Sequence, residues 1–214
     1  MNQPKIRIED YTYELPDERI AKYPLDQRDK SKLLIYNKGI ISQEQFSSIP
    51  SFIPEGSMMV FNNTKVVPAR LFFKKDTGAL IEIFCLEPVT PSDYSVSFAC
   101  ISECSWKTII GNVKKWKGGY LSFFVPEGAD SDVVGLNLKA ELIEKQDNSY
   151  IVRFFWEGGH PFSKVLELCG QVPIPPYLNR ETEAVDLERY QTLYAKFRGS
   201  VAAPTAGLHF TEDV

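Results

Sequence analysis

The sequence lacks most of the short motifs that identify common enzyme classes. Its 214 residues contain no Walker loop, no GxGxxG turn, no HExxH helix and no CxxC pair, so the usual fingerprints of nucleotide, zinc and redox sites are absent. No apolar run approaches the roughly 18 residues that a membrane-spanning helix needs, and the first residues have no apolar segment like that of a signal peptide. We therefore expect a cytoplasmic protein with no metal and no permanently bound cofactor.

Positive charge and cysteine are also scarce. The 24 Lys and Arg residues stand against 28 Asp and Glu residues, giving a net charge of −4, which argues against a protein that coats nucleic acid by charge alone. Any nucleic-acid site must therefore be a local patch. The four cysteines, Cys85, Cys100, Cys104 and Cys169, are too sparse for a disulfide framework, and we expect buried free thiols.

Both ends of the chain have the mixed pattern of an α/β domain. A helix is expected within Leu15–Leu25 and an apolar strand at Lys32–Asn37, because Pro and Asp begin helices and proline ends them. Near the other end, Pro161 and Gly170 bracket a second helix, an extended proline-rich segment follows, and a short helix begins after Asp186.

The middle of the chain alternates apolar and polar residues, as half-buried antiparallel strands do. From about Leu71 onward, we expect about six strands, and closing them into a small barrel removes their edges. The predicted fold is an α/β large domain, incomplete at its C-terminus, formed by residues 1–68 and 157–214, with an antiparallel β-barrel inserted at residues 69–156. The clearest strands are Ala79–Leu86, Tyr94–Cys100, Gly119–Val125, Leu138–Leu142 and Tyr150–Trp156.

Two short segments have the composition of ligand-binding loops. Nearly all residues between Gly199 and Gly207 are small, which lets the backbone approach a ligand closely or lets a tight turn form between strands. Asn62, Asn63 and Thr64 follow an expected apolar strand and suit either a small ligand or an Asx turn. Thr211 occupies the N-cap position of a further helix, so we expect the large domain to continue in a longer chain.

Six segments occur together in an order and spacing typical of one family. They are "YELP", "RDKSKLL", "FNNTKVVPARL", "PIPPY", "RYQTLYAK" and "GSVAAPTAGLHFT". The sequence resembles S-adenosylmethionine:tRNA ribosyltransferase-isomerases of the queuosine pathway over nearly its whole length. The resemblance implies an α/β domain carrying a β-barrel, and an enzyme that consumes S-adenosylmethionine as a co-substrate. The ribosyl part passes to the 7-aminomethyl-7-deazaguanine base of tRNA and becomes epoxyqueuosine, while adenine and methionine leave. Members of the family are longer, so this chain is expected to be inactive alone.

The resemblance also implies a substrate site, whose polar residues are expected to converge on one cleft. His209 is its candidate acid–base residue, because histidine readily exchanges protons near neutral pH. In an expected strand, Leu208 and Phe210 point to the opposite face. A structural histidine is the alternative, and His160 is a weaker candidate. The implied substrate-binding residues are Arg28, Asp29, Asn62, Asn63, Thr64, Arg70, Tyr190, Pro204, Thr205, Ala206 and Gly207.

The expected tRNA contact is a basic loop, Ser102–Gly119, which departs from the family's usual barrel loop. An exposed patch of lysines with Trp106 and Trp116 between them can contact phosphates and stack on a base, although a solvated hairpin is the alternative. Lys32 and Lys65 also differ from the family pattern, which often has arginine at these two positions. A non-catalytic RNA-binding barrel is the rival function. The predicted tRNA-binding residues are Lys107, Lys114, Lys115, Lys117 and Trp116.

Overall fold

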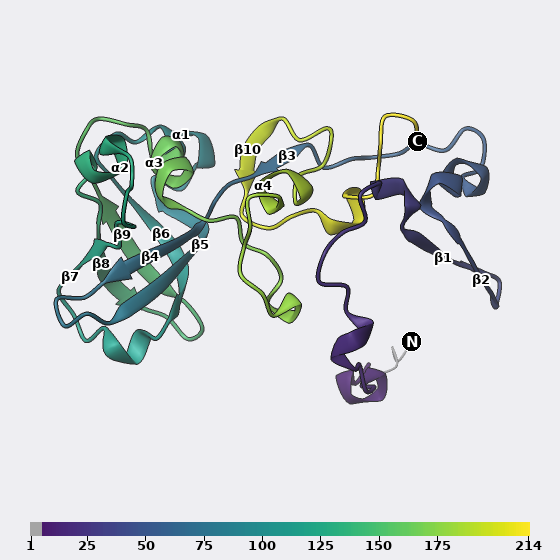
Figure 1. Ribbon diagram of the computed structural model, residues 1–214, viewed down its shortest axis with the longest axis horizontal. Coiled ribbons are helices and arrows are strands. Elements are labelled where there is room, and N and C mark those ends of the chain that lie inside the picture. The colour runs from purple at the N-terminus through teal and green to yellow at the C-terminus, as the bar shows by residue number, and fades with distance from the viewer. Residues whose placement is uncertain (1–5) are drawn as a thin grey trace, which may run out of the picture.

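Alternation of apolar side chains produces a closed barrel at one end of the molecule (Figure 1), as seen in a computed structural model that describes residues 6–214. The strands pair antiparallel in the order β4-β5-β6-β9-β8-β7, and β4 pairs with β7 to close the ring. The predicted six-stranded barrel is therefore confirmed. Its strands are β4 (Arg70–Lys74), β5 (Leu80–Thr90), β6 (Glu103–Gly111), β7 (Tyr120–Phe123), β8 (Lys139–Lys145) and β9 (Tyr150–Phe155).

Inward-facing side chains of the barrel form the main core together with one helix. Phe73, Trp106 and Phe154 are completely buried. The predicted helix between Pro161 and Gly170 is confirmed as α3 (Phe162–Cys169), and its Phe162 ring lies 5.6 Å from the rings of both Trp106 and Phe154. Such aromatic packing adds to the large apolar area that these side chains bury.

Two assignments within the barrel region were wrong, and each has a physical reason. Residues Tyr94–Ala99 form helix α1 rather than a strand, because the Asp93 side chain caps it by accepting a bond from the Val96 N–H at 3.0 Å. Tyr94 and Phe98 are four residues apart and therefore share one face of a helix, so the apolar pattern of this segment fits a helix as well as a strand. Residues Glu103–Gly111, expected within the basic loop, form strand β6, because Cys104, Trp106, Thr108 and Ile110 alternate toward the barrel interior and are buried there. A small helix, α2, spans Ser131–Gly135.

The α/β part of the fold lies beside the barrel, at the centre of the molecule (Figure 1). Strand β10 (Phe197–Ser200) pairs parallel with β3 (Thr64–Val66). The Gln191 side chain extends this pairing, since it accepts from the Val66 N–H at 2.9 Å and donates to the Val66 carbonyl at 2.8 Å. The short helix expected after Asp186 is confirmed as α4 (Asp186–Arg189).

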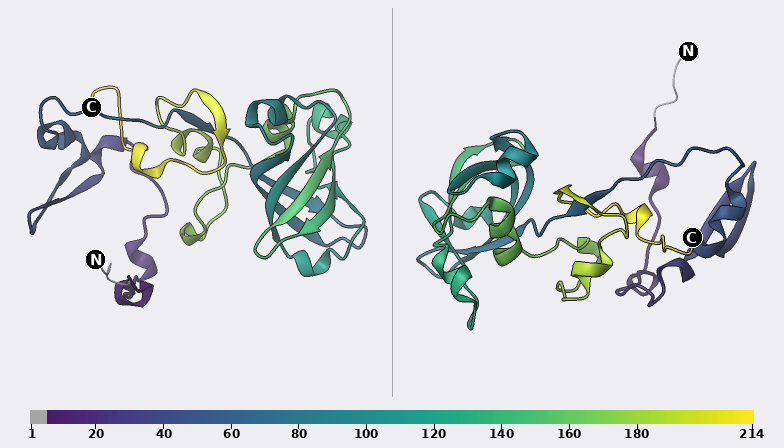
Figure 2. Two further views of the ribbon diagram at one scale, coloured as in Figure 1. Left: turned by 180° about the vertical axis from the view of Figure 1, so that it is seen from behind. Right: turned by 90° about the horizontal axis from the view of Figure 1, so that it is seen from above.

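A β-hairpin occupies the end of the molecule opposite the barrel (Figure 2). Its strands are β1 (Lys32–Asn37), which matches the predicted strand, and β2 (Ile40–Gln45). Lys38 and Gly39 both have positive φ, at 47° and 90°, as a two-residue turn matched to the strand twist requires. The remaining short helical turns are Ile8–Tyr11, Asp17–Arg19, Arg28–Lys30, Phe46–Phe52, Val113–Lys115, Pro176–Leu178 and Thr205–Gly207.

Three other expected elements are wrong in the large domain. Within Leu15–Leu25 only a single turn, Asp17–Arg19, is helical, because the carbonyls that follow bond to distant arginine side chains. Neither the segment before Asn62 nor residues 208–210 form a strand. The division into domains at residues 68 and 157 stays a prediction.

The cysteines are free thiols, as expected, and three of them, Cys85, Cys104 and Cys169, are buried. Burial raises the pKa of Cys169 to about 12, so it remains a thiol near neutral pH. No helix in the described residues, 6–214, has both the length and the apolar character needed to cross a membrane.

The chain enters and leaves the barrel at one tight crossing. Gln171 and Arg70 exchange backbone hydrogen bonds of 2.8 and 3.2 Å. At the neighbouring position, a Cβ added to Gly170 lies 1.9 Å from the Pro68 carbonyl oxygen and 2.6 Å from that of Leu166. Both obstacles are backbone atoms, so only glycine fits without moving the two segments apart.

We predict that Gly170→Ala lowers the free energy of unfolding by about 3 kcal/mol or more, because backbone must shift to admit the methyl group. Gly135→Ala is the matched control, since its added Cβ meets nothing within 4 Å. Urea unfolding of both variants provides the measurement. Equal stabilities of the two variants would show that the crossing is not tight in solution.

Candidate functional site

A cavity of about 590 Å³ lies between an early and a late segment of the chain. Residues from Ile20 to Lys32 form one wall, and residues from Pro175 to His209 form the other. Four of the residues predicted for the substrate site line it together: Arg28, Tyr190, Thr205 and His209. We call this the cationic cavity, for reasons of charge given below.

Two arginines hold the walls together through backbone carbonyls. Both walls consist mostly of irregular chain, whose carbonyl groups need hydrogen-bond partners. The Arg28 guanidinium donates to the carbonyls of Gln191 at 2.6 Å, Glu188 at 2.9 Å and Leu208 at 3.2 Å. In the opposite direction, Arg189 donates to the carbonyls of Asp26 and Leu25. Arg28, which is predicted to bind substrate, therefore also holds the two cavity walls together.

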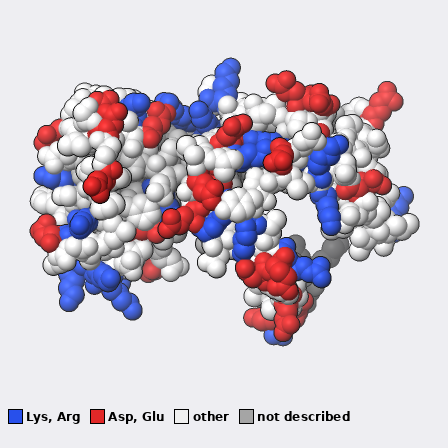
Figure 3. Space-filling view, in the orientation of Figure 1, with Lys and Arg blue, Asp and Glu red and all other residues white. Residues whose placement is uncertain are grey.

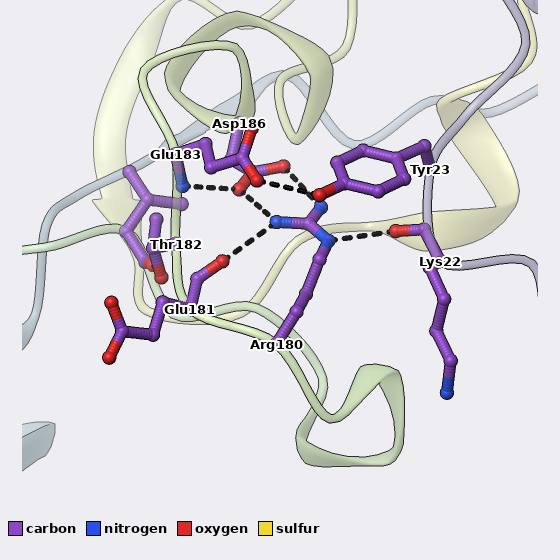
Figure 4. A network of polar contacts seen from close by, with 8 residues as sticks. Lys22, Tyr23, Arg180, Glu181, Thr182, Glu183 and Asp186 are labelled. Carbon is purple, nitrogen blue, oxygen red and sulfur yellow. Dashed lines mark hydrogen bonds and ion pairs between the residues drawn. The ribbon is translucent and has the colours of Figure 1, made fainter.

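A third arginine joins the same walls in a network shown in Figure 4. Arg180 donates to the Lys22 carbonyl at 2.8 Å and to both carboxylate oxygens of Asp186 at 2.7 Å. The Tyr23 ring lies 4.6 Å from the guanidinium, and its hydroxyl donates to Glu183 at 2.7 Å. Asp186 is fully buried. Hydrogen bonds from Arg180 hold the pKa of Asp186 below its ordinary value, although burial acts against them.

His209 lies in the cavity wall against an aromatic cluster. Its ring centroid is 5.4 Å from that of Phe46, and Phe210 meets Phe46 and Phe61 edge-on at 4.9 and 5.1 Å. Within residues 6–214, the His209 ring nitrogens have no hydrogen-bond partner. A structural histidine tied to backbone carbonyls is therefore not what the geometry shows, and the acid–base role stays a prediction.

The small-residue segment lines a second cavity, of about 340 Å³, which we call the apolar cavity. Val201, Ala202 and Ala203 face Phe84 and the segment Pro173–Pro175. Tyr190, Thr205 and Pro175 belong to both cavities, so the two adjoin.

The rest of the signature segment supports its fold. A Cβ on Gly207 would lie 2.4 Å from the Tyr194 hydroxyl oxygen, so glycine allows a close approach there. The Pro204 carbonyl accepts from the Gly207 N–H at 2.8 Å, and Ala206 is exposed. The hydroxyl of Thr211 donates to Asp29 at 3.5 Å.

The other predicted substrate residues do not reach these cavities. The Asn62 side-chain oxygen accepts from the backbone N–H and the hydroxyl of Thr64 at 2.9 and 2.6 Å. This is the Asx turn that the sequence analysis gives as the alternative to a ligand site. The Asn63 carbonyl accepts from Lys196 and Phe197. Convergence of the implied residues on one cleft is thus only partial, and the Asn62 and Thr64 side chains bond to each other instead.

Arg70 lies at the barrel side of a separate cavity of about 630 Å³ and pairs with Glu82 at 2.6 Å. This cavity adjoins the apolar one, since Phe84, Ile174 and Pro175 line both.

The basic loop of the barrel differs from expectation in its tryptophans. Trp106 is 0% and Trp116 only 3% exposed, because both side chains fill the barrel core, and Trp116 donates to the Gly119 carbonyl at 3.1 Å. The prediction that they stack on RNA as exposed rings is wrong. Lys107 pairs with Glu87 at 2.9 Å. Lys114, Lys115 and Lys117 are exposed, and Figure 3 shows basic side chains at the lower end of the barrel.

Sequence reasoning missed the residues that build the cavity walls: Tyr23, Arg180, Asp186 and Arg189. The only available signal was arginine in and beside a proline-rich segment with little regular structure, where carbonyls need donors. Among residues 6–214 no group of three or more His, Cys, Asp and Glu side chains is arranged to hold a metal ion.

We predict that Asp186→Asn destabilises the protein by about 3 kcal/mol at neutral pH, because Arg180 loses a buried charged partner. The pKa of Asp186 is lowered in the folded state, so its stabilising effect is fully present above the unfolded-state value of about 3.9. It is lost as the pH falls through the folded-state pKa.

Urea unfolding at a series of pH values measures this effect. The difference between wild type and variant should shrink in acid. Asp17→Asn is the control, since Asp17 pairs with Lys22 but is 68% exposed, and such pairs contribute at most about 1 kcal/mol. A variant as stable as wild type at neutral pH would contradict the role of the network.

Comparison with known proteins supports the family resemblance that the six sequence segments indicate. A family described as queuosine biosynthesis protein matches residues 8–214. The chain is 40% identical over 209 residues to the S-adenosylmethionine:tRNA ribosyltransferase-isomerase of Trichlorobacter lovleyi, covering 97% of this chain and 54% of that protein. It is 37% identical over 212 residues to the protein of the same name from Aquifex aeolicus, covering 98% and 56%.

The chain spans about half the length of the curated relatives it matches. Among solved structures, it is similar to the crystal structure of S-adenosylmethionine tRNA ribosyltransferase from Thermotoga maritima, with 30% identity, 66% of this chain and 43% of that chain covered, and a TM-score of 0.26. Because the family match extends over almost all of its residues, the chain belongs to the queuosine biosynthesis protein family.

Proposed function

We propose that this chain supplies substrate-binding surfaces for a transferase-isomerase acting on tRNA. The reaction moves the ribosyl part of S-adenosylmethionine to the aminomethyl group of the 7-deazaguanine wobble base and yields epoxyqueuosine. Family membership supports the proposal, as do relatives named for this activity. A reaction between tRNA and S-adenosylmethionine fits a cytoplasmic protein in which the latter is a co-substrate rather than a permanently bound cofactor.

The observation that carries the proposal is the pair of adjoining cavities. One has four cationic side chains among its apolar lining residues, the other is lined by small and apolar residues without charge, and they share Tyr190, Thr205 and Pro175. An enzyme that joins two substrates must hold their reacting atoms side by side. Two unlike cavities with a common wall meet that requirement.

His209 is the proposed acid–base residue. It lines the cationic cavity together with Thr205, which also lines the apolar one. The reaction needs a proton removed from the carbon next to the sulfonium and later proton transfers as adenine departs. An imidazole with no partner on its ring nitrogens within residues 6–214 can accept the first proton and return it.

The barrel is proposed to contact the tRNA backbone through Lys114, Lys115 and Lys117. In this proposal residues 69–156 form the tRNA-contacting domain, and residues 1–68 and 157–214 form the reaction site. A non-catalytic RNA-binding barrel is the rival function, but it leaves the cavities and the matched segments outside the barrel unexplained.

We predict that His209→Asn slows the chemical step by about a hundredfold or more. The assay is single-turnover release of adenine by a chimera in which residues 1–214 replace the matching part of the Trichlorobacter lovleyi relative. His160→Asn is the matched control, because it makes the same change at a histidine that does not line the three cavities described above. Normal turnover by the His209 variant would assign His209 to the aromatic cluster alone.

We predict that replacing Lys114, Lys115 and Lys117 with Gln weakens tRNA binding and flattens its salt dependence, by a slope of about 0.7 to 0.9 per lost phosphate contact. Fluorescence titration at several salt concentrations measures both quantities. Lys107→Gln should change little, since Glu87 already compensates that charge. An unchanged affinity of the triple variant would remove the barrel patch from the tRNA interface.

A further inference from the structure

The lining of the cationic cavity carries more positive than negative charge. Lys22, Arg28, Lys32 and Arg189 line it, and no Asp or Glu is found among its described lining residues. The whole chain has more acidic than basic residues, so this local excess is opposite to the average. Concave surfaces of one sign concentrate ions of the other sign.

The neighbouring cavities do not share this property. The cavity beside the barrel contains Arg70 and Arg180, balanced by Glu82 and Glu181. The apolar cavity is lined by no charged side chain among the residues described. Of these three adjoining cavities, only the one formed by the arginine-linked walls has an excess of cations among its described lining residues.

The guanidinium groups of Arg28 and Arg189 bond to backbone carbonyls. Because a carbonyl has no formal charge, it does not compensate the positive charge of the arginine. Arg28 and Arg189 donate to five carbonyls between them. Burial, and then the charge of Arg189, hold the pKa of Arg28 below its ordinary value, against the opposing charge of Glu188. Two cations held close together in this way gain from an added anion.

Lys32 is the most available cation of the four. It is exposed on β1, and its side chain has no hydrogen bond or ion pair with another residue within 6–214, whereas Lys22 pairs with Asp17 at 2.7 Å. Tyr177 also lines the cavity and is 60% exposed. A cationic groove with an accessible aromatic ring is the arrangement that single-stranded nucleic acids prefer.

We propose that the cationic cavity binds a phosphodiester of single-stranded RNA through Lys32 and Arg189, with Tyr177 available to stack on the adjacent base. The inference rests on the proposed function and assigns its two substrates to separate cavities. S-adenosylmethionine carries a positive sulfonium, which the cations without an acidic partner in this cavity repel, so we assign it to the uncharged apolar cavity. The RNA backbone, which is anionic, fits the other.

The test compares Lys32→Gln with Lys30→Gln in the 214-residue chain. Lys30 is exposed, two residues away, and does not line the cavity, so both variants lose the same net charge. The probes are a labelled RNA stem-loop with a single-stranded loop and, separately, S-adenosylmethionine. We expect Lys32→Gln to weaken RNA binding about tenfold and to lower the salt slope by about 0.7. Lys30→Gln should change RNA affinity by less than about twofold.

Three other outcomes decide against the inference. Equal losses in the two variants would show a diffuse charge effect, and no RNA binding by the wild-type chain would show that the cavity has another occupant. Weaker binding of S-adenosylmethionine with RNA binding unchanged would assign the cavity to a carboxylate instead. If RNA binding depends on Lys32 but the chimera releases no adenine, the proposed reaction fails while the phosphodiester site stands.

Discussion

Hydrogen bonds from arginine side chains to backbone carbonyls are the interaction on which the candidate site depends. Residues 20–28 have little regular structure, and the late segment that faces them has only short elements such as α4. Arg28, Arg180 and Arg189 supply donors across the gap, over sequence separations of about 160 residues or more. A buried carbonyl left without a donor costs free energy comparable to a lost hydrogen bond. The three arginines thus replace the sheet or helix that would normally fix two such walls.

The same arrangement gives the cavity its chemical character. The charge of an arginine that bonds only to carbonyls is not compensated by these partners, whereas the charge of Arg180 is compensated by the Asp186 carboxylate. Arg28 and Arg189 therefore build the wall and leave it positive. Beyond the shared residues Tyr190 and Thr205, small and apolar side chains make the next cavity neutral. Structure and electrostatics come from one set of side chains, so a change to either arginine affects both.

Elements with one clear periodicity were predictable from sequence, and contacts between irregular segments were not. Strand β1, helix α3 and most barrel strands matched because their apolar patterns fit one period. Residues 94–99 satisfied both the strand and the helix pattern, and the Asp93 cap decided for the helix. The resemblance pointed to Arg28, Thr205 and His209, which share a cavity. It could not reveal their carbonyl partners, since any residue can offer a carbonyl and the pairing is set by tertiary structure. Trp106 and Trp116 were misplaced because a basic neighbourhood suggested exposure.

Hydrogen exchange in an Arg28→Lys variant tests the central role of the arginine contacts most directly. Lysine keeps the charge but cannot offer the planar fork that reaches three carbonyls at once. The account predicts faster exchange of the backbone amides in residues 186–191 and 207–210, with barrel amides unchanged. Exchange in those segments that matches the wild type would contradict it, and would show that the cavity walls hold together without the arginine.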